Sequence, residues 1–236
     1  MQKTGRVYEK PEHRNTFEGI LHRIRAGCPW RDLPGEFGDW SQVYRRFNNW
    51  SKKGVLIAIF DALKTDPDFE WVFIDGSIVK AHQHAAGAAS KGDEGIGKSV
   101  AGNTTKIHLS VDSYGLPINF EITGGEVHDS KMAAQLIDAL PPTSYIVCDK
   151  GYDSEEIRNV VINKQSIPVI PRKRNSKIGN RDMDWALYKH RHLVENAFAR
   201  LKNYRSIATR FDKLKRNFES VVALGCAIMW LPMNID

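Results

Sequence analysis

Apolar residues recur at every third or fourth position in the first part of the chain, which is the spacing of helices that pack on one side. These stripes predict helices over residues 15–26, 39–53 and 55–63, separated by breaks rich in glycine and proline. Because no strand pattern interrupts them, we expect residues 1–66 to form a small all-α module.

The pattern changes after residue 66. Residues 71–79 form a short apolar run that contains an acid, residues 105–112 alternate, and residues 116–123 return after a glycine turn. These three segments predict antiparallel strands. Further along we expect, in order, a helix over 129–140 capped by Asp129 or Ser130, a strand over 144–149, a helix over 154–164, a strand over 166–171, and a long helical region from Asp184 to about Trp230. Residues 67–236 are therefore predicted to be an α/β domain in which helices flank a mixed sheet.

Basic residues follow the second predicted helix of the N-terminal module, with Arg45 and Arg46 on its outer side. A helix, a turn and a basic second helix fit a small helix-turn-helix-like DNA-binding module. The same spacing fits a plain three-helix packing or dimerisation unit. The pattern alone leaves both open.

Charge is distributed unevenly along the chain. The net charge is +6, but residues 171–216 hold 14 Lys and Arg against 4 Asp and Glu, so the remainder is net acidic. A basic face in the C-terminal third suits a polyanionic partner, and it also suits a solvated helix.

No apolar run approaches the length of a membrane span, and the first residues lack the apolar core of a signal peptide. We expect a cytoplasmic protein with no membrane partner.

Two carboxylates stand where burial is expected. Asp75 lies inside the first predicted strand and Asp149 ends the fourth. An unpaired carboxylate in such a place is costly, so each is either neutralised by a nearby cation or shared with a bound metal. Neighbouring strands can bring both to one edge of the sheet, where divalent ions such as magnesium prefer oxygen ligands.

The predicted C-terminal helical region adds a third acid. Tyr188, Arg191, Glu195 and Lys202 lie at offsets of 0, 3, 7 and 14, which place them within an arc of roughly 60° at about 100° per residue. The adjoining arc is apolar and suits packing on a sheet. A solvated, salt-bridged helix can show the same spacing, but it has no need of acids on two strands.

Two short patterns suggest other ligands but lack the required context. Residues 92–99, GDEGIGKS, match the phosphate-binding loop, yet no buried strand precedes them and no helix pattern begins at their end. We expect a mobile glycine-rich loop and no nucleotide cofactor.

His82 and His84 are two residues apart, but two ligands do not complete a zinc site, so a structural or DNA-contact role is expected. Three distant cysteines predict free thiols.

Several of these segments resemble bacterial insertion-sequence transposases of the DDE class. The segment YKHRHLVENAFARLK carries their spacing of Tyr, Arg, Glu and Lys, and DKGYDSEEIR and FIDGSIVKAHQHAAG are similar to the blocks around their two catalytic aspartates. This spacing of Tyr, Arg, Glu and Lys is similar to the signature of IS-four-like transposases. Two further segments, TTKIHLSVDSYGLPINFEITGGEVHDS and GCPWRDLPGEFGDWSQVYRRF, resemble the IS-five type in particular. The resemblance covers nearly the whole chain.

The resemblance implies a ribonuclease H-like catalytic domain that cleaves phosphodiesters and transfers strands at insertion-sequence ends. Asp75, Asp149 and Glu195 would hold two magnesium ions, with manganese as a substitute. Tyr188, Arg191 and Lys202 would contact DNA backbone, and Arg45 and Arg46 would belong to the N-terminal DNA-binding module. The implied partners are the terminal inverted repeats and target double-stranded DNA, bound by a homodimer at the nucleoid.

Two alternatives from other classes remain at this point. One is a catalytically defective transposase that only occupies transposon ends; intact acids at all three positions argue against it. The other is a structure-selective nuclease with the same fold, which differs by lacking strand transfer.

Overall fold

The computed structural model describes residues 11–85 and 94–231, and its first three helices confirm the predicted helical spacing. They are α1 (Pro11–Ala26), α2 (Trp40–Lys52) and α3 (Val55–Leu63). The Asp39 carboxylate caps α2 by accepting from the amides of Ser41 and Gln42. Two short 3-10 turns, η1 (Trp30–Asp32) and η2 (Gly35–Phe37), occupy the proline-rich break between α1 and α2.

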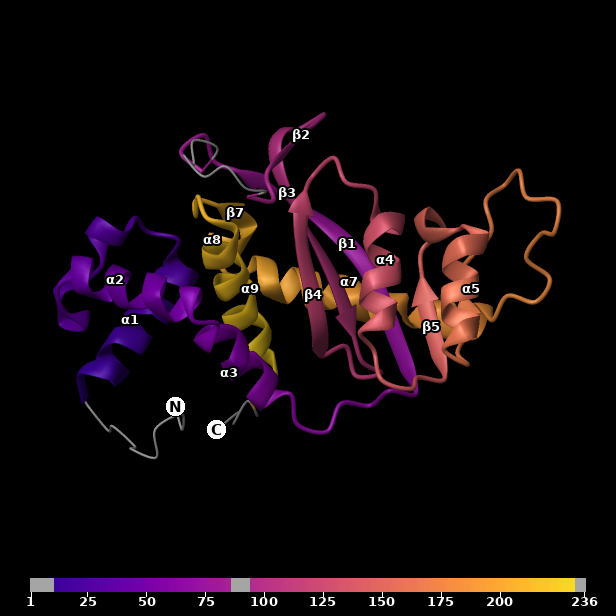
Figure 1. The fold of residues 1–236 in the computed structure, drawn as a ribbon, viewed down its shortest axis with the longest axis horizontal. Coiled ribbons are helices and arrows are strands. Elements are labelled where there is room, and N and C mark those ends of the chain that lie inside the picture. The colour runs from indigo at the N-terminus through magenta and orange to yellow at the C-terminus, as the bar shows by residue number, and fades with distance from the viewer. Residues whose placement is uncertain (1–10, 86–93, 232–236) are drawn as a thin grey trace.

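The second part of the chain folds as a mixed sheet with helices on both faces (Figure 1). Its strands are β1 (Trp71–Ala81), β2 (Gly97–Ser99), β3 (Gly102–Val111), β4 (Pro117–Gly124), β5 (Tyr145–Cys148), β6 (Ile167–Val169) and β7 (Thr209–Arg210). β1, β3 and β4 are antiparallel, as predicted, and β5 and β6 continue the sheet in parallel from β1. The order β4-β3-β1-β5-β6 is the arrangement of a ribonuclease H-like sheet, so the predicted fold class is confirmed.

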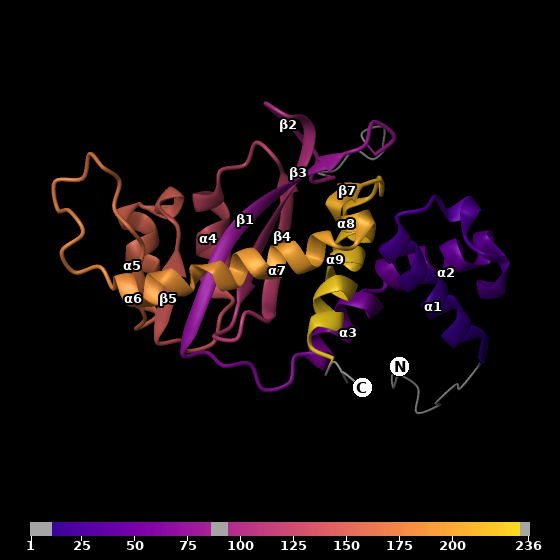
Figure 2. The same cartoon turned by 180° about the vertical axis from the view of Figure 1, so that it is seen from behind.

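The sheet separates two apolar clusters, one under the helices on each of its faces. α4 (Asp129–Asp138) and α5 (Glu155–Asn163) cover one face of the sheet, where Val72, Ile74 and Ile146 are buried against them. α7 (His192–Lys202) crosses the other face, as Figure 2 shows from behind. Because side chains alternate along β1, Phe73 points to the α7 side while its neighbours point to the α4 side.

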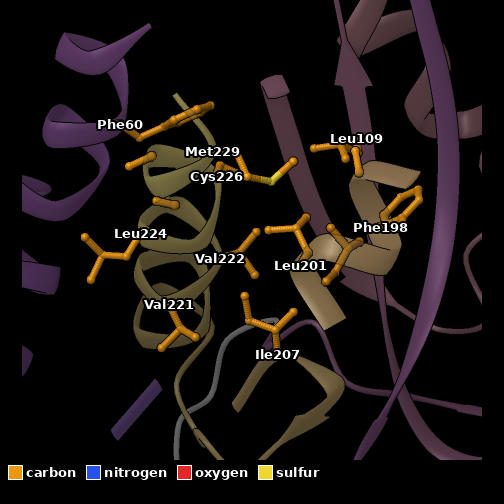
Figure 3. Packing of buried hydrophobic residues seen from close by; sticks show 14 of the residues in the cluster. Phe60, Leu109, Phe198, Leu201, Ile207, Val221, Val222, Leu224, Cys226 and Met229 are labelled. Atoms are coloured by element: carbon orange, nitrogen blue, oxygen red, sulfur yellow. The ribbon is translucent and has the colours of Figure 1, made fainter. Parts of the chain in front are cut away.

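The N-terminal helices share their core with the last helix of the chain. α9 (Lys215–Met229) packs against α2 and α3, and its apolar residues lie between Phe60 and the α7 residues Phe198 and Leu201 (Figure 3). A buried ion pair joins α1 to the segment between β7 and α9, with Arg23 Nη1 3.0 Å from Asp212 Oδ2. The proposed domain boundary at residue 66 stays a prediction; the packing shows that the two parts are joined by one apolar cluster.

The C-terminal region differs from the single long helical run that its pattern suggests. It contains α6 (Trp185–Tyr188), η4 (Lys189–Arg191), α7, α8 (Arg205–Ala208), β7 and α9. β7 leaves the helical path to pair with Lys80 and Ala81 at the end of β1. Arg210 is fully buried there and donates to the backbone oxygens of Gly95 and Asp212, so it does not belong to the basic surface. Pairing with a strand 129 residues upstream in sequence cannot be read from local periodicity.

No helix in the part of the chain that the structure describes has the length and apolarity needed to cross a bilayer.

Candidate functional site

The two strand aspartates lie at adjacent positions of neighbouring parallel strands. Ile74 on β1 stands opposite Cys148 on β5, and Asp75 and Asp149 are the next residues of each strand. Both acids therefore reach the same level of the sheet, at the point where β5 ends. Their arrangement matches the edge that the sequence predicted.

Asp75 lies in an environment that disfavours its charge. Burial is the main reason why the pKa of Asp75 is raised, and the negative charges of Asp149 and Asp129 raise it further. The Gly76 amide, which donates to Asp75 Oδ1 at 2.8 Å, and the guanidinium of Arg191 act in the opposite direction. Carboxylates thus gather around Asp75, and the guanidinium of Arg191 lies among them.

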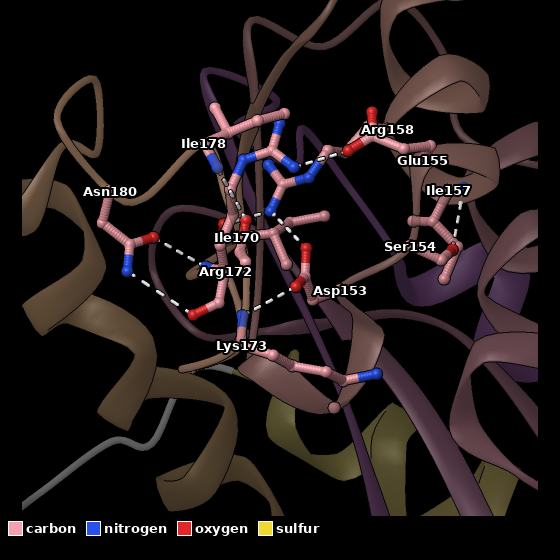
Figure 4. Close-up of polar contacts among 12 residues, drawn as sticks. Asp153, Ser154, Glu155, Ile157, Arg158, Ile170, Arg172, Lys173, Ile178 and Asn180 are labelled. Carbon is pink, nitrogen blue, oxygen red and sulfur yellow. Dashed lines mark hydrogen bonds and ion pairs between the residues drawn. The ribbon is translucent and has the colours of Figure 1, made fainter.

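The chain after β5 is held so that Asp149 has a fixed position. Asp149 Oδ1 accepts from the Gly151 amide at 2.6 Å and begins the turn η3 (Lys150–Tyr152). Beyond this turn Arg158 Nη2 donates to Asp153 Oδ1 at 2.8 Å and to the backbone oxygen of Ile170 at 2.6 Å (Figure 4). Asp153 and Arg158 are both largely buried, and their pair supports the turn that follows Asp149.

Arg191 joins two of the three predicted metal ligands. Its Nη1 lies 2.8 Å from Asp75 Oδ2, and its Nη2 donates to Glu195 Oε1 one helical turn further along. The backbone of α6, η4 and α7 is continuous, which keeps Arg191 and Glu195 on the side that faces β1. Glu195 remains more than half exposed, whereas Asp75 and Arg191 are about one fifth exposed.

The other two residues of the predicted arc lie along the same helical path. Lys202 Nζ donates to Ser77 Oγ at 2.7 Å, two residues beyond Asp75 on β1, and burial lowers the pKa of Lys202. Tyr188 packs edge-on against Trp185, with 5.8 Å between the ring centroids, and burial raises its pKa. The arc from Tyr188 to Lys202 thus follows the β1 edge that carries Asp75.

The carboxylates provide hard oxygen donors of the kind that magnesium and manganese prefer. Asp75 and Asp149 are brought together by the register of β1 and β5, and the negative charge of Asp149 acts on Asp75. Within residues 11–85 and 94–231, however, no three acidic, histidine or cysteine side chains already converge as metal ligands. The donor set fits a divalent cation, provided that Arg191 leaves Asp75 and Glu195.

Arg45 and Arg46 belong to α2, which lies on the opposite side of the molecule from β5, the strand that Asp149 follows (Figure 1). Arg46 Nη1 donates to Thr16 Oγ1 at 3.0 Å and to the backbone oxygen of Glu12 at 3.2 Å, so this side chain joins α2 to α1. Arg45 is exposed. Of the two, Arg45 is the residue available to a partner.

The segment that resembles a phosphate-binding loop is anchored where the structure describes it. Its end forms β2 (Gly97–Ser99), a strand rather than the start of a helix. Glu94 Oε2 accepts from the Lys215 amide at 2.6 Å, and Arg210 Nη2 donates to the Glu94 backbone oxygen at 2.8 Å. Arg210 and the start of α9 therefore contact this segment at Glu94, whereas the mobility of the loop stays a prediction; residues 92–93 lie outside the described part.

The paired histidines make aromatic contacts with each other and with the C-terminal region. His82 stacks on Phe211, with ring centroids 4.6 Å apart, and lies 4.9 Å from the His84 ring. The three cysteines are free thiols, as their spacing predicted.

The sequence pattern missed the position of a fourth acid, Asp129. It was expected as a helix cap, but the cap position of α4 belongs to His128 and Asp129 is the first helical residue. Its Oδ1 lies 3.2 Å from Lys106 Nζ and 3.5 Å from His108 Nδ1. The sequence shows only that an acid follows three predicted antiparallel strands. This position fits a helix cap as well as a residue of a functional site.

Comparison with known proteins gives a consistent result over both parts of the chain. Residues 67–230 match the family model of the transposase DDE domain, and residues 1–60 match a transposase model of the IS4/5 family. The transposase assigned to insertion sequence element IS6501 of Brucella ovis is 34% identical over 128 residues, covering 54% of this chain and 98% of the relative. That assigned to IS402 of Burkholderia cepacia is 30% identical over 136 residues, covering 53% and 62%.

Among solved structures, the piggyBac transposase in a synaptic complex with hairpin DNA aligns with a TM-score of 0.44 at 11% identity. The alignment covers 75% of this chain and 46% of that chain, so the chain spans less than half of this solved relative.

Proposed function

Because the chain belongs to the transposase DDE domain family, we propose that it cleaves and joins DNA at the ends of an insertion sequence, with Asp75, Asp149 and Glu195 as the catalytic acids. The observation that carries this assignment is the parallel register of β1 and β5, which puts Asp75 beside Asp149 below α7. Arg191 on α7's helical path pairs with Asp75 and Glu195, and the charge of Asp149 acts on both Asp75 and Arg191.

Asp75, Asp149 and Glu195 would hold two divalent ions, magnesium in the cell and manganese as a substitute. When bound there, such ions would supply positive charge for the attacking water or 3'-hydroxyl and for the leaving oxygen of the phosphodiester. The protein's own part is to position the groups. The Gly151 amide and the Arg158–Asp153 pair fix Asp149, while the Gly76 amide orients Asp75.

Arg191 and Lys202 provide positive charge for DNA phosphates next to the acids, with Tyr188 on the same path. Lys202 is already placed by Ser77 beside β1, and Arg191 can exchange its carboxylate partners for a phosphate. We assign the N-terminal helices to end recognition, with exposed Arg45 as the candidate contact. Two copies bound to paired terminal inverted repeats would then act on target DNA.

The test uses the full chain and labelled DNA that contains the sequences flanking its own reading frame. With magnesium or manganese we expect nicks that leave a 3'-hydroxyl at the repeat boundary, followed by joining to a target plasmid. Asp75→Asn should abolish both products, whereas Asp138→Asn, at an exposed position on α4, should not change them.

The possible results separate the three functions. Binding of the ends without nicking by the unaltered chain would favour a defective transposase. Nicking without joining would favour a nuclease. Cleavage retained in Asp75→Asn would contradict the assignment of the acids.

A further inference from the structure

One stretch of β1 has an open edge beside the acidic residues. β5 pairs with β1 up to Ile74, and β7 pairs with it again only from Lys80. Between these points, in the described part of the chain, no strand lies against this edge of β1. Groups from the α4 face and the α7 face can therefore approach the same few residues, Asp75 and Gly76 above all.

Asp129 comes to this place from the α4 face. His108 is paired with Gly76 across β1 and β3, and Lys106 is two residues earlier on β3. Asp129 Oδ1 lies between their side chains, 3.2 Å from Lys106 Nζ and 3.5 Å from His108 Nδ1. Lys106 is itself fixed, because its Nζ donates to the backbone oxygen of Val127 at 2.8 Å. Oδ1 is thus held against β1 by two side chains of the neighbouring strand.

Gly76 is what allows Asp129 to lie so close to the strand. A Cβ at position 76 would stand 2.3 Å from Asp129 Oδ1 and 3.4 Å from His108 Nδ1, so a larger residue would displace the carboxylate. The glycine has no unusual dihedral that would otherwise explain it, since it is absent from the residues with positive φ. The close approach of Asp129 gives a physical reason for glycine directly after Asp75.

Polar groups at this position are buried without full compensation. His108 is completely buried, and neither its Nδ1 nor Asp129 Oδ1 makes a hydrogen bond of normal geometry among the described residues. Atoms without such a hydrogen bond are rare in folded proteins and call for an explanation, and for Asp129 Oδ1 the ion pair with Lys106 is part of it. The Asp129 side chain is 31% exposed, although its Oδ1 is buried. The exposed area therefore belongs to the other atoms of this side chain.

We propose that Asp129 is a fourth carboxylate of the metal-binding site, anchored through Oδ1 and offering Oδ2 to the cation bound by Asp75 and Asp149. The electrostatics agree, because the charge of Asp129 acts on Asp75 together with that of Asp149. Lys106 then has two effects, since it holds Asp129 in place and limits the excess negative charge before a cation arrives. This assignment rests on the proposed function of the same site.

The experiment measures binding of manganese to the DNA-free full chain, by calorimetry and by the shift in melting temperature. Asp129→Asn keeps the shape of the side chain and should weaken manganese binding about 10-fold or more, which is typical when a group supporting a metal site is removed. The matched control, Asp138→Asn, removes an exposed carboxylate from the other end of the same helix and should bind manganese as the unaltered chain does.

Gly76→Ala provides an independent second variant, because it keeps every carboxylate while its Cβ clashes first with Asp129 Oδ1 and lies at closer than usual contact with His108. It should weaken manganese binding to a similar extent, and the double variant should be little worse than either single one, since both remove the same contribution. Folding of each variant is checked by circular dichroism before titration.

The outcomes distinguish failure of the Asp129 assignment from failure of the proposed metal site as a whole. If Asp75→Asn weakens manganese binding but Asp129→Asn matches Asp138→Asn, the fourth carboxylate is refuted and the proposed function stands. If Asp129→Asn lowers only the metal-free melting temperature, Asp129 is a structural partner of Lys106 and the proposal is again refuted. If the unaltered chain and Asp75→Asn bind manganese equally, the proposed metal site itself fails.

Discussion

Arg191 and Asp75 are 116 residues apart in sequence, yet Arg191 Nη1 lies 2.8 Å from Asp75 Oδ2. The same guanidinium contacts Glu195, so one cation neutralises two of the three acids assigned to catalysis. Since a guanidinium cannot hold both carboxylates and a DNA phosphate at once, release of Arg191 by DNA would free the acids for metal. Binding of DNA and binding of metal are therefore expected to favour each other.

The first prediction concerns this coupling. Arg191→Gln should raise the affinity for manganese in the absence of DNA, because the carboxylates of Asp75 and Glu195 lose their internal cation. The same variant should bind end-containing DNA more weakly. Manganese titrations with and without DNA measure both effects, and Arg181→Gln, at an exposed arginine before α6, is the control. A manganese affinity that is unchanged or lowered in Arg191→Gln would show that Arg191 does not compete with metal.

A second prediction separates catalysis by Glu195 from folding. Glu195→Gln removes an ion pair with Arg191 in which the Glu195 side chain is more than half exposed, and such a helical pair contributes only ~0.5 kcal/mol. The metal-free melting temperature should therefore change little, whereas stabilisation by manganese should fall and strand cleavage should be lost. Melting curves with and without metal and a nicking assay decide this. Cleavage at the normal rate would reduce Glu195 to a salt-bridge partner.

A third prediction tests phosphate contact by Lys202. Lys202→Ala should weaken binding to transposon ends and lower the salt dependence of binding by about one counterion, with no change in the preferred base sequence. Fluorescence anisotropy at several salt concentrations gives the slope. Lys131→Ala, on α4 at the opposite face of the sheet, should leave the slope unaltered. A changed base preference at constant slope would count against the backbone contact.

A fourth prediction follows from the buried histidine. Burial lowers the pKa of His108 from its ordinary value of 6.5 to about 4, although Asp129 acts in the opposite direction. The unfolded chain therefore takes up a proton at His108 before the folded chain does. Stability should fall as the pH is lowered from 6.5 to 4, by no more than about 3 kcal/mol from this residue.

The measurement is urea unfolding across that pH range, compared between the unaltered chain and His108→Gln. The variant should lose the His108 share of the acid destabilisation, even if its stability at neutral pH is lower. The matched change at exposed His22 should leave the pH dependence as it is. Equal slopes for the unaltered chain and His108→Gln would contradict the lowered pKa.

Much of the local structure was determined by the sequence itself. The three-to-four spacing predicted α1, α2 and α3, because burial of one side imposes the period of the element. A short apolar run predicted β1, and an alternating segment with a glycine turn after it predicted β3 and β4. Asp75 and Asp149 could be recognised as unusual for the same reason, since a carboxylate in an apolar strand is costly. The arc from Tyr188 to Lys202 also follows from helix geometry alone.

Only the tertiary structure decided which of these groups meet. The register of β1 and β5 brings Asp75 beside Asp149, and the crossing of α7 brings Arg191 between Asp75 and Glu195. Local periodicity carries no information on such pairings, because register and crossing depend on packing between segments far apart in the chain.

The position of Asp129 and the course of the C-terminal region show the same limit. A first-turn acid looks like a cap until Lys106 and His108 on another strand are seen beside it. Arg210 counts as surface charge until β7 pairs with β1 and buries it. In each case the sequence determined the chemical group and its local element, and long-range packing decided its electrostatic surroundings and so its role.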